Sequence, residues 1–253
     1  MGIIQGFIFG FIIIFNRKLN NKTNIFLSLT VFSLSISNLQ YWLEDSNLNI
    51  SFPYLNYVRI PTEFLIIPMF YIFVNNYIEK NIKFKYILLL ITPFIVDLIA
   101  QILLSINLYF YQNNLISEKS IFYFLVTEEI FSFSYSCFLI ILTFSKVRRY
   151  EKENLDFSKL KVKANTKWLK QILLIGLFSC SFWIIEIIVM YRYAILKGMQ
   201  IYYPLWICIT FIIYWLSYIG LFQSTIFQER KEIRKISEKK RLTILKMKEL
   251  QIY

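Results

Sequence analysis

The sequence predicts an all-α integral membrane protein with seven transmembrane helices, its N-terminus outside and its C-terminus in the cytoplasm. Hydrophobic residues make up 57% of the 253 residues, yet the chain also carries 28 lysines and arginines. The apolar residues lie in blocks close to the roughly 20 residues that cross a bilayer as a helix, and most basic residues lie between the blocks. This pattern predicts a transmembrane domain over residues 1–223 and a basic cytoplasmic tail or linker over residues 224–253.

The apolar blocks predict helices at 2–15, 24–43, 58–78, 86–109, 121–145, 169–191 and 201–222. The first block is short for a span, so its helix must cross with little tilt or draw the bilayer inward. No positive residue precedes this block and no small-residue cleavage site follows it, which argues against a cleaved signal peptide.

The positions of lysine and arginine predict the orientation, because short cytoplasmic loops are enriched in these residues. With the N-terminus outside, 24 of the 28 fall in the cytoplasmic segments 16–23, 79–85, 146–170 and 223–253. Only four remain for the outer side, and they are Arg59, Lys119, Arg192 and Lys197. We therefore expect a multi-pass protein of the cytoplasmic (inner) membrane. Its net charge of +12 reflects basic loops beside anionic lipid headgroups rather than direct nucleic-acid binding.

Several classes of chemistry are excluded by what the sequence lacks. It has no histidine, so it offers no phosphoacceptor histidine, no imidazole metal ligand and no histidine base for a catalytic triad. It also lacks the glycine-rich motifs that cradle phosphates. Its three cysteines lie inside expected helices, where cysteine behaves as a small apolar residue; they are Cys137, Cys180 and Cys208. We expect no enzymatic activity, no cofactor and no metal site.

Acidic residues inside the apolar blocks are the main functional candidates. They are Glu63, Asp97, Glu128, Glu129 and Glu186. A charged side chain at mid-helix costs about 2.5–3.5 kcal/mol on insertion scales, so it is functional by default. In the expected topology all five lie at the midplane or in the outer half of the membrane. This depth predicts a polar chamber that opens outward.

Two arginines are expected at about the same depth in the membrane as these carboxylates. Arg59 precedes Glu63 by four residues, which predicts that the two share one helical face. Arg192 follows Glu186 at the outer end of the sixth expected helix. Each of these arginines is therefore a candidate partner for an embedded carboxylate.

Aromatic side chains lie at a similar depth, among them Trp42 and Trp206. Carboxylates with aromatic faces suit a small amphipathic or cationic ligand. A purely structural polar network and proton-linked sensing through a carboxylate are the open alternatives. The adjacent Glu128 and Glu129 are not expected to face one pocket together.

Three prolines are candidates for coupling the outside to the inside. Pro61 and Pro68 fall in the third expected helix and Pro93 in the fourth, where each could introduce a kink. A purely structural role is the favoured alternative, because proline is common in membrane helices.

The segment after Phe222 carries apolar residues at spacings of three, four and seven among dense charges, which predicts a helix. It could continue the seventh helix into the cytoplasm, with Arg230 and Arg234 as candidate coupling residues. A basic amphipathic stretch that rests on the membrane surface is the alternative.

Three segments resemble a known family: GIIQGFIFGFIIIFNRKLNNKTNIFLSLTVFSLSI, PTEFLIIPMFYIFV and YWLSYIGLFQSTIF. They are similar to the seven-helix membrane domain of AraC-type transcriptional regulators of Bacteroidetes-like bacteria. In that family a linker similar to SEKKRLTILKMKELQIY leads into a DNA-binding domain of two helix-turn-helix units, which these 253 residues do not contain.

The resemblance implies a membrane-embedded sensor that relays a ligand or membrane state to a cytoplasmic output such as transcriptional regulation. The chain would be the sensor part of a longer regulator or would signal through a partner. The embedded carboxylates leave a small secondary transporter or proton-coupled membrane protein as the alternative. The expected partners are the lipid bilayer and a small-molecule ligand, and a homodimer is left open.

Overall fold

A computed structural model of the chain describes residues 2–15, 22–46, 48, 52, 59–78, 82–111, 116–153, 155–192 and 202–222. Within these ranges it contains seven helices and no strands, which confirms the all-α prediction. The helices are α1 (Gly2–Phe15), α2 (Lys22–Asp45), α4 (Glu63–Ile78), α5 (Phe84–Tyr111), α6 (Glu118–Glu153), α7 (Leu155–Arg192) and α8 (Tyr203–Phe222). The tail 224–253, with Arg230 and Arg234, lies outside the described residues.

Three of these helices are long and apolar enough to cross a membrane, over Phe84–Asn107, Lys119–Glu153 and Thr166–Val189. Three others, α1, α4 and α8, are apolar but shorter. Exposed apolar side chains are most extensive on α5, where Leu89, Val96 and Leu103 are each more than 60% exposed. A soluble monomer rarely leaves so large an apolar face uncovered. These features agree with a membrane protein.

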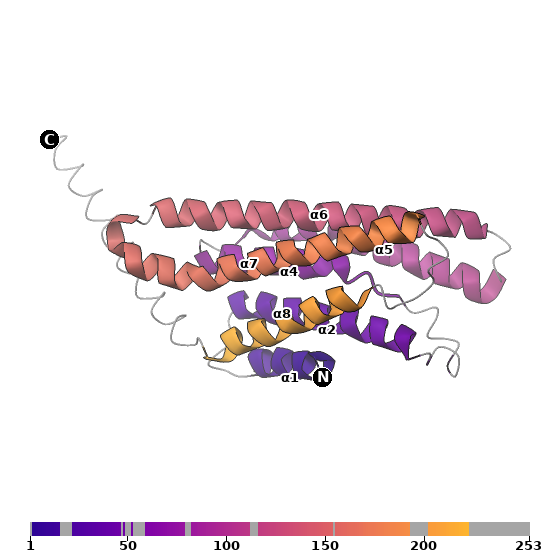
Figure 1. Ribbon diagram of the computed structural model, residues 1–253, viewed down its shortest axis with the longest axis horizontal. Helices are drawn as coiled ribbons and strands as arrows, with labels where there is room; N and C mark the ends of the chain where they lie inside the picture. Colours follow the sequence, from indigo (N-terminus) through magenta and orange to yellow (C-terminus); the bar gives the residue numbers. More distant parts are fainter. Residues whose placement is uncertain are drawn as a thin grey trace.

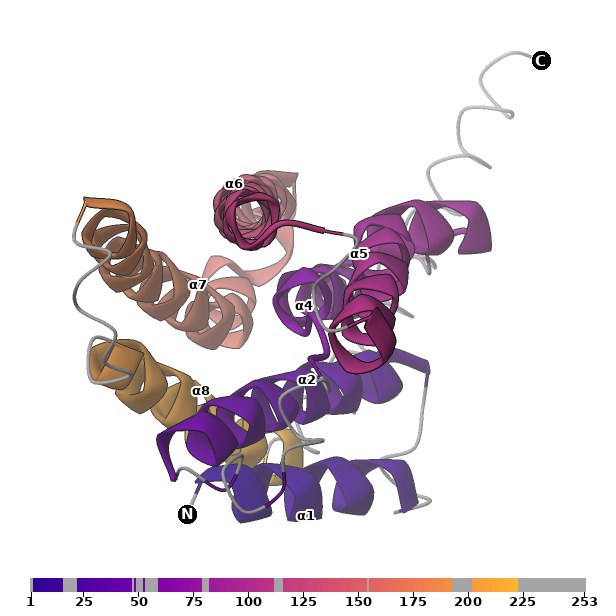
Figure 2. The same cartoon turned by 90° about the vertical axis from the view of Figure 1, so that its right-hand side faces the viewer.

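Helices α6 and α7 form a long antiparallel pair that runs the length of the molecule (Figure 1). Helix α4 packs between α6 and α2, and α8 packs on α1, α2 and α7. The end view shows α5 at the edge, beside α4 (Figure 2). Five helices, α2, α4, α6, α7 and α8, therefore surround the centre of the molecule, and α1 and α5 flank it.

Helix α4 begins later than the sequence predicts, at Glu63 rather than at residue 58. Pro61 lies ahead of it, and proline disfavours the helical conformation in the preceding residue, Ile60. Thr62 starts the helix, since its carbonyl oxygen accepts a hydrogen bond from the Ile66 N–H at 3.1 Å. The prediction of a Pro61 kink is therefore wrong, whereas Pro68 and Pro93 do lie inside α4 and α5.

The expected loop at 146–170 is largely helical, because α6 continues to Glu153 and α7 already begins at Leu155. No glycine or proline interrupts this segment. Ion pairs add stability: Arg149 Nε lies 2.7 Å from Glu153 Oε1, and Lys170 Nζ lies 2.7 Å from Glu151 Oε1. Apolar length marks only the part of a helix that suits lipid, so the predicted end of α6 comes too early and the predicted start of α7 too late.

A glycine stripe that the sequence analysis missed holds the short α1 in place. Gly2, Gly6 and Gly10 are buried at a spacing of four residues, which lets a helix approach its neighbours closely. A Cβ atom at Gly10 would lie 2.6 Å from the Phe32 ring, and one at Gly6 would overlap the Ser35 hydroxyl. Close packing against α2 and α8 therefore holds this short helix in the bundle.

Candidate ligand-binding site

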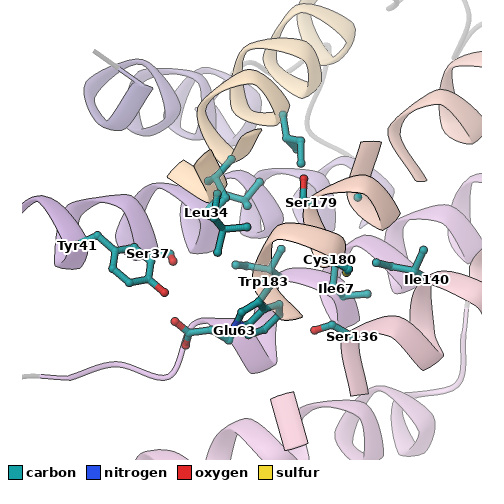
Figure 3. Close-up of a pocket in the computed structure, with 15 residues that line it drawn as sticks. Leu34, Ser37, Tyr41, Glu63, Ile67, Ser136, Ile140, Ser179, Cys180 and Trp183 are labelled. Carbon is teal, nitrogen blue, oxygen red and sulfur yellow. The ribbon is translucent and has the colours of Figure 1, made fainter. Parts of the chain in front are cut away.

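A cavity of about 90 Å³ lies at the centre of the five surrounding helices. Its walls are mainly apolar, and its residues include Leu34, Ile67, Ile140, Cys180 and Ile209 (Figure 3). A second cavity of about 50 Å³ adjoins it and shares several of these walls. This cavity is apolar along most of its length and includes only Glu63 of the five predicted acidic residues, so a polar chamber that opens outward stays a prediction.

One end of the cavity is polar. Glu63 and Tyr41 line it there, and their polar ends point toward one another (Figure 3). Glu63 Oε2 is buried and has no hydrogen-bond partner within the described part of the chain. Burial disfavours the negative charge of Glu63, and the helix N-terminus partly offsets this because Glu63 is the first residue of α4. The Glu63 carboxyl group therefore keeps one oxygen that can still accept a hydrogen bond.

Arg59 lies just outside the cavity in the segment before α4. Gln40 of α2 fixes this segment, since its amide donates to Ile60 O at 3.0 Å and accepts from Ile60 N at 2.8 Å. The prediction that Arg59 and Glu63 share a helical face is wrong, because Arg59 precedes the helix. The guanidinium instead approaches α6.

Both adjacent glutamates of α6 reach this guanidinium. Arg59 Nη2 lies 3.7 Å from Glu128 Oε1 and 3.9 Å from Glu129 Oε1. The two glutamates therefore share one cation, but neither lines the cavity, so the expectation that they do not face one pocket together stays a prediction. The two side chains leave α6 about 100° apart, but a cation placed between those directions is within reach of both.

Two further side chains fix these glutamates. Gln101 of α5 donates to Glu128 Oε2 at 2.7 Å, and Trp183 of α7 donates to Glu129 Oε2 at 2.8 Å. Asp97 lies one turn before Gln101 and contacts Glu128. Gln101 and Trp183 are not among the predicted site residues, although a side-chain amide in an apolar block, four residues after Asp97, indicates a polar contact there.

Glu186 is the most enclosed of the five carboxyl groups. Its residue is only 3% exposed, and neither carboxyl oxygen has a hydrogen-bond partner among the described residues. It lies near Glu129 and Tyr202. The side chain of Arg192 at the end of α7 lies outside the described part, so the relation predicted between Arg192 and Glu186 stays a prediction.

The aromatic residues divide between the site and the surface. Tyr41 stacks on Tyr202, with ring centroids 5.6 Å apart, and lies 5.4 Å from the Trp206 ring. Trp206 thus supports a wall residue of the cavity without lining it. Trp42 is 50% exposed and does not line the cavity. Glu44 lies two residues after Trp42, just beyond the expected helix 24–43. Burial raises the pKa of its carboxyl group, and the charge of Arg59 lowers this pKa to a smaller extent.

Five carboxyl groups and one arginine therefore meet beside one end of an apolar cavity, counting only side chains that the structure describes. Within the same residues, no group of three histidine, cysteine or acidic side chains could hold a metal ion. The arrangement suits recognition of a molecule that has an apolar body and a polar head.

Comparison of the chain with protein-family models, curated proteins and solved structures finds no match. The resemblance to the membrane domain of AraC-type regulators therefore stays a prediction.

Proposed function

We propose that this chain is a membrane-embedded sensor domain that binds a small amphipathic ligand in the central cavity and relays its presence to a cytoplasmic output. The observation that carries the proposal is the apolar cavity that ends at a buried Glu63 oxygen without a partner. Other buried acceptors also lack a partner among the described residues, including both oxygens of Glu186. Glu63 is the one of them that lines the cavity, so its open oxygen is placed to meet a ligand there.

The relay is proposed to run through α4 and α7, each of which carries a cavity residue and a polar contact farther along the helix. Helix α4 carries Glu63 at its start and Asn75 near its end, where Lys146 Nζ of α6 bonds Asn75 Oδ1 at 2.6 Å. Helix α7 carries Trp183 on the cavity and Lys170 in the ion pair with Glu151. A ligand that shifts α4 against α7 would change both the Lys146–Asn75 hydrogen bond and the Lys170–Glu151 ion pair. Transcriptional regulation is the output that the family resemblance favours.

The full topology of seven spans with an outer N-terminus in the inner membrane belongs to the same proposal. It requires the first and last helices to run in the same direction. Gly2 lies against Thr210 and Gly6 against Ile213, so α1 and α8 are parallel. The end of α8 and the turn between α6 and α7 lie toward one end of the molecule (Figure 1), where the basic segments would face the cytoplasm.

Alkaline phosphatase fusions test this topology, because the enzyme is active only outside the cytoplasm. Fusions after Asn47 and Asn114 should be active, and a fusion after Lys159 should be inactive. The reverse pattern would contradict the outer N-terminus. Activity after Lys159 alone would contradict the path of α6 through the membrane.

The sensor function is tested in the native host with a chromosomal Glu63→Gln variant, compared by transcript profiling with a deletion strain. Glutamine keeps the shape of the side chain and removes the charge, so the profile should match the deletion while membrane levels of the protein stay unchanged. Glu153→Gln is the matched control, since that residue is exposed at the far end of α6.

A wild-type profile in the Glu63→Gln strain would remove this site from the sensor. Saturable substrate flux into liposomes that hold the purified chain, abolished in Asp97→Asn, would favour the transporter instead.

A further inference from the structure

We infer that the ligand of the central cavity is an amphipathic organic cation, with its ammonium group on Glu63 and its hydrocarbon body between α4, α6 and α7. The inference rests on the proposed ligand-binding function and names the chemical class that the cavity selects. It follows from the charge balance at the polar end, the hydrogen-bonding capacity there and the shape of the apolar part.

The charge balance favours a cation. Arg59 is the one basic side chain that forms ion pairs with these carboxylates in the described part of the chain, and Glu128 and Glu129 already share it. The Arg59 charge also acts on Glu63, but from beyond ion-pair distance, and Glu63 forms no ion pair of its own among the same residues. Carboxylates in an apolar surrounding are costly unless an opposite charge offsets them. An ammonium group at Glu63 would supply that charge.

The hydrogen-bonding capacity points the same way. The unused Glu63 oxygen accepts hydrogen bonds, and an ionised carboxylate only accepts them. An alkylammonium group only donates, so it complements this oxygen. The Tyr41 hydroxyl group points toward Glu63 and offers a second oxygen that can accept a hydrogen bond from the ammonium group (Figure 3). An anionic head would instead meet a like charge.

The apolar part sets the size of the ligand. An apolar cavity of about 150 Å³ in another protein holds benzene, so about 90 Å³ with an adjoining 50 Å³ suits a chain of roughly six carbons. Ile67 and Ile140 border both cavities. Each buried methylene should strengthen binding about fourfold until the chain outgrows the space.

Binding of three probes to the purified full chain in nanodiscs tests the inference: hexylammonium, hexanol and hexanoate, measured by calorimetry. Empty nanodiscs supply the correction for partition into lipid. Hexylammonium should bind at least tenfold more tightly than hexanol, and hexanoate should bind most weakly. In Glu63→Gln the advantage of hexylammonium over hexanol should disappear, while Glu153→Gln should retain it.

Gly176→Leu supplies a second variant that does not depend on charge. Gly176 lines both cavities, and a Cβ atom there would lie 3.6 Å from Ile140 Cδ1, which is ordinary contact. The leucine side chain should fill the space and abolish specific binding of all three probes.

Hexanol binding as tightly as hexylammonium, or a preference for hexylammonium that survives Glu63→Gln, would overturn the cation assignment and leave the cavity as a ligand site. Binding of no probe to the wild-type chain would overturn the assignment together with the proposed site. Unchanged binding in Gly176→Leu would place the ligand elsewhere and overturn it as well.

Discussion

Replacement of Gly6 by leucine is expected to cost about 3 kcal/mol in the free energy of unfolding, the upper part of the range for overpacking. A Cβ atom at this position would overlap the Ser35 hydroxyl and lie 3.1 Å from Ile213 Cγ2. The remaining leucine atoms have no room between α2 and α8, so α1 must move away. Unfolding by sodium dodecyl sulfate in mixed micelles measures the change.

Gly176→Leu is the matched control, because it makes the same substitution at a helical glycine that borders a cavity. Leucine also has the better helix propensity by about 1 kcal/mol. We expect this variant to be at least as stable as the wild-type chain. Equal stability of Gly6→Leu and Gly176→Leu would show that α1 does not dock through its glycine stripe.

Removal of Arg59 is the second change with a large expected effect. Arg59→Met should destabilise the fold by about 3 kcal/mol, the low end for breaking a buried ion pair, because its side chain is 35% exposed whereas that of Glu128 is only 5% exposed. The carboxylates then lose their shared cation and repel one another. The same micelle titration, followed by tryptophan fluorescence, reports the loss.

The double variant Arg59→Met with Glu128→Gln tests the cause. Neutralising Glu128 should restore about 1 kcal/mol or more, since coupled charges are not additive. Arg149→Met is the control: its pair with Glu153 is shorter, 2.7 Å, but both side chains are exposed, so the change should stay within about 0.5 kcal/mol. No recovery in the double variant would contradict electrostatic coupling between Arg59 and Glu128.

The carboxylate site was predictable in its members but not in its pairings. Apolar sequence around Glu63 and Glu186 was enough to mark them as costly and hence as candidates. Which residues pair with Arg59 depends on the place where α4 begins. Pro61 and the Gln40 hydrogen bonds to Ile60 decide that place, and they involve a residue 20 positions away in the sequence.

The cavity could not have been predicted from the sequence. Its walls come from five helices, and its residues are ordinary for a membrane span, such as Leu34, Ser136 and Ile209. Apolar periodicity does not tell a residue that faces lipid from one that faces a space inside the bundle. The sequence around Gly176 likewise does not indicate that this residue borders the cavities.

The sequence by itself determined the helical class, the positions of the apolar helices to within a few residues at most ends, and the set of acidic residues inside apolar blocks, because hydrophobicity and charge are local properties of the chain. Tertiary structure alone decided that α1 docks through Gly6 and its neighbours, that Glu128 and Glu129 share Arg59, and that Glu63 ends an apolar cavity. These features depend on distances between helices, which the order of residues along one helix does not contain.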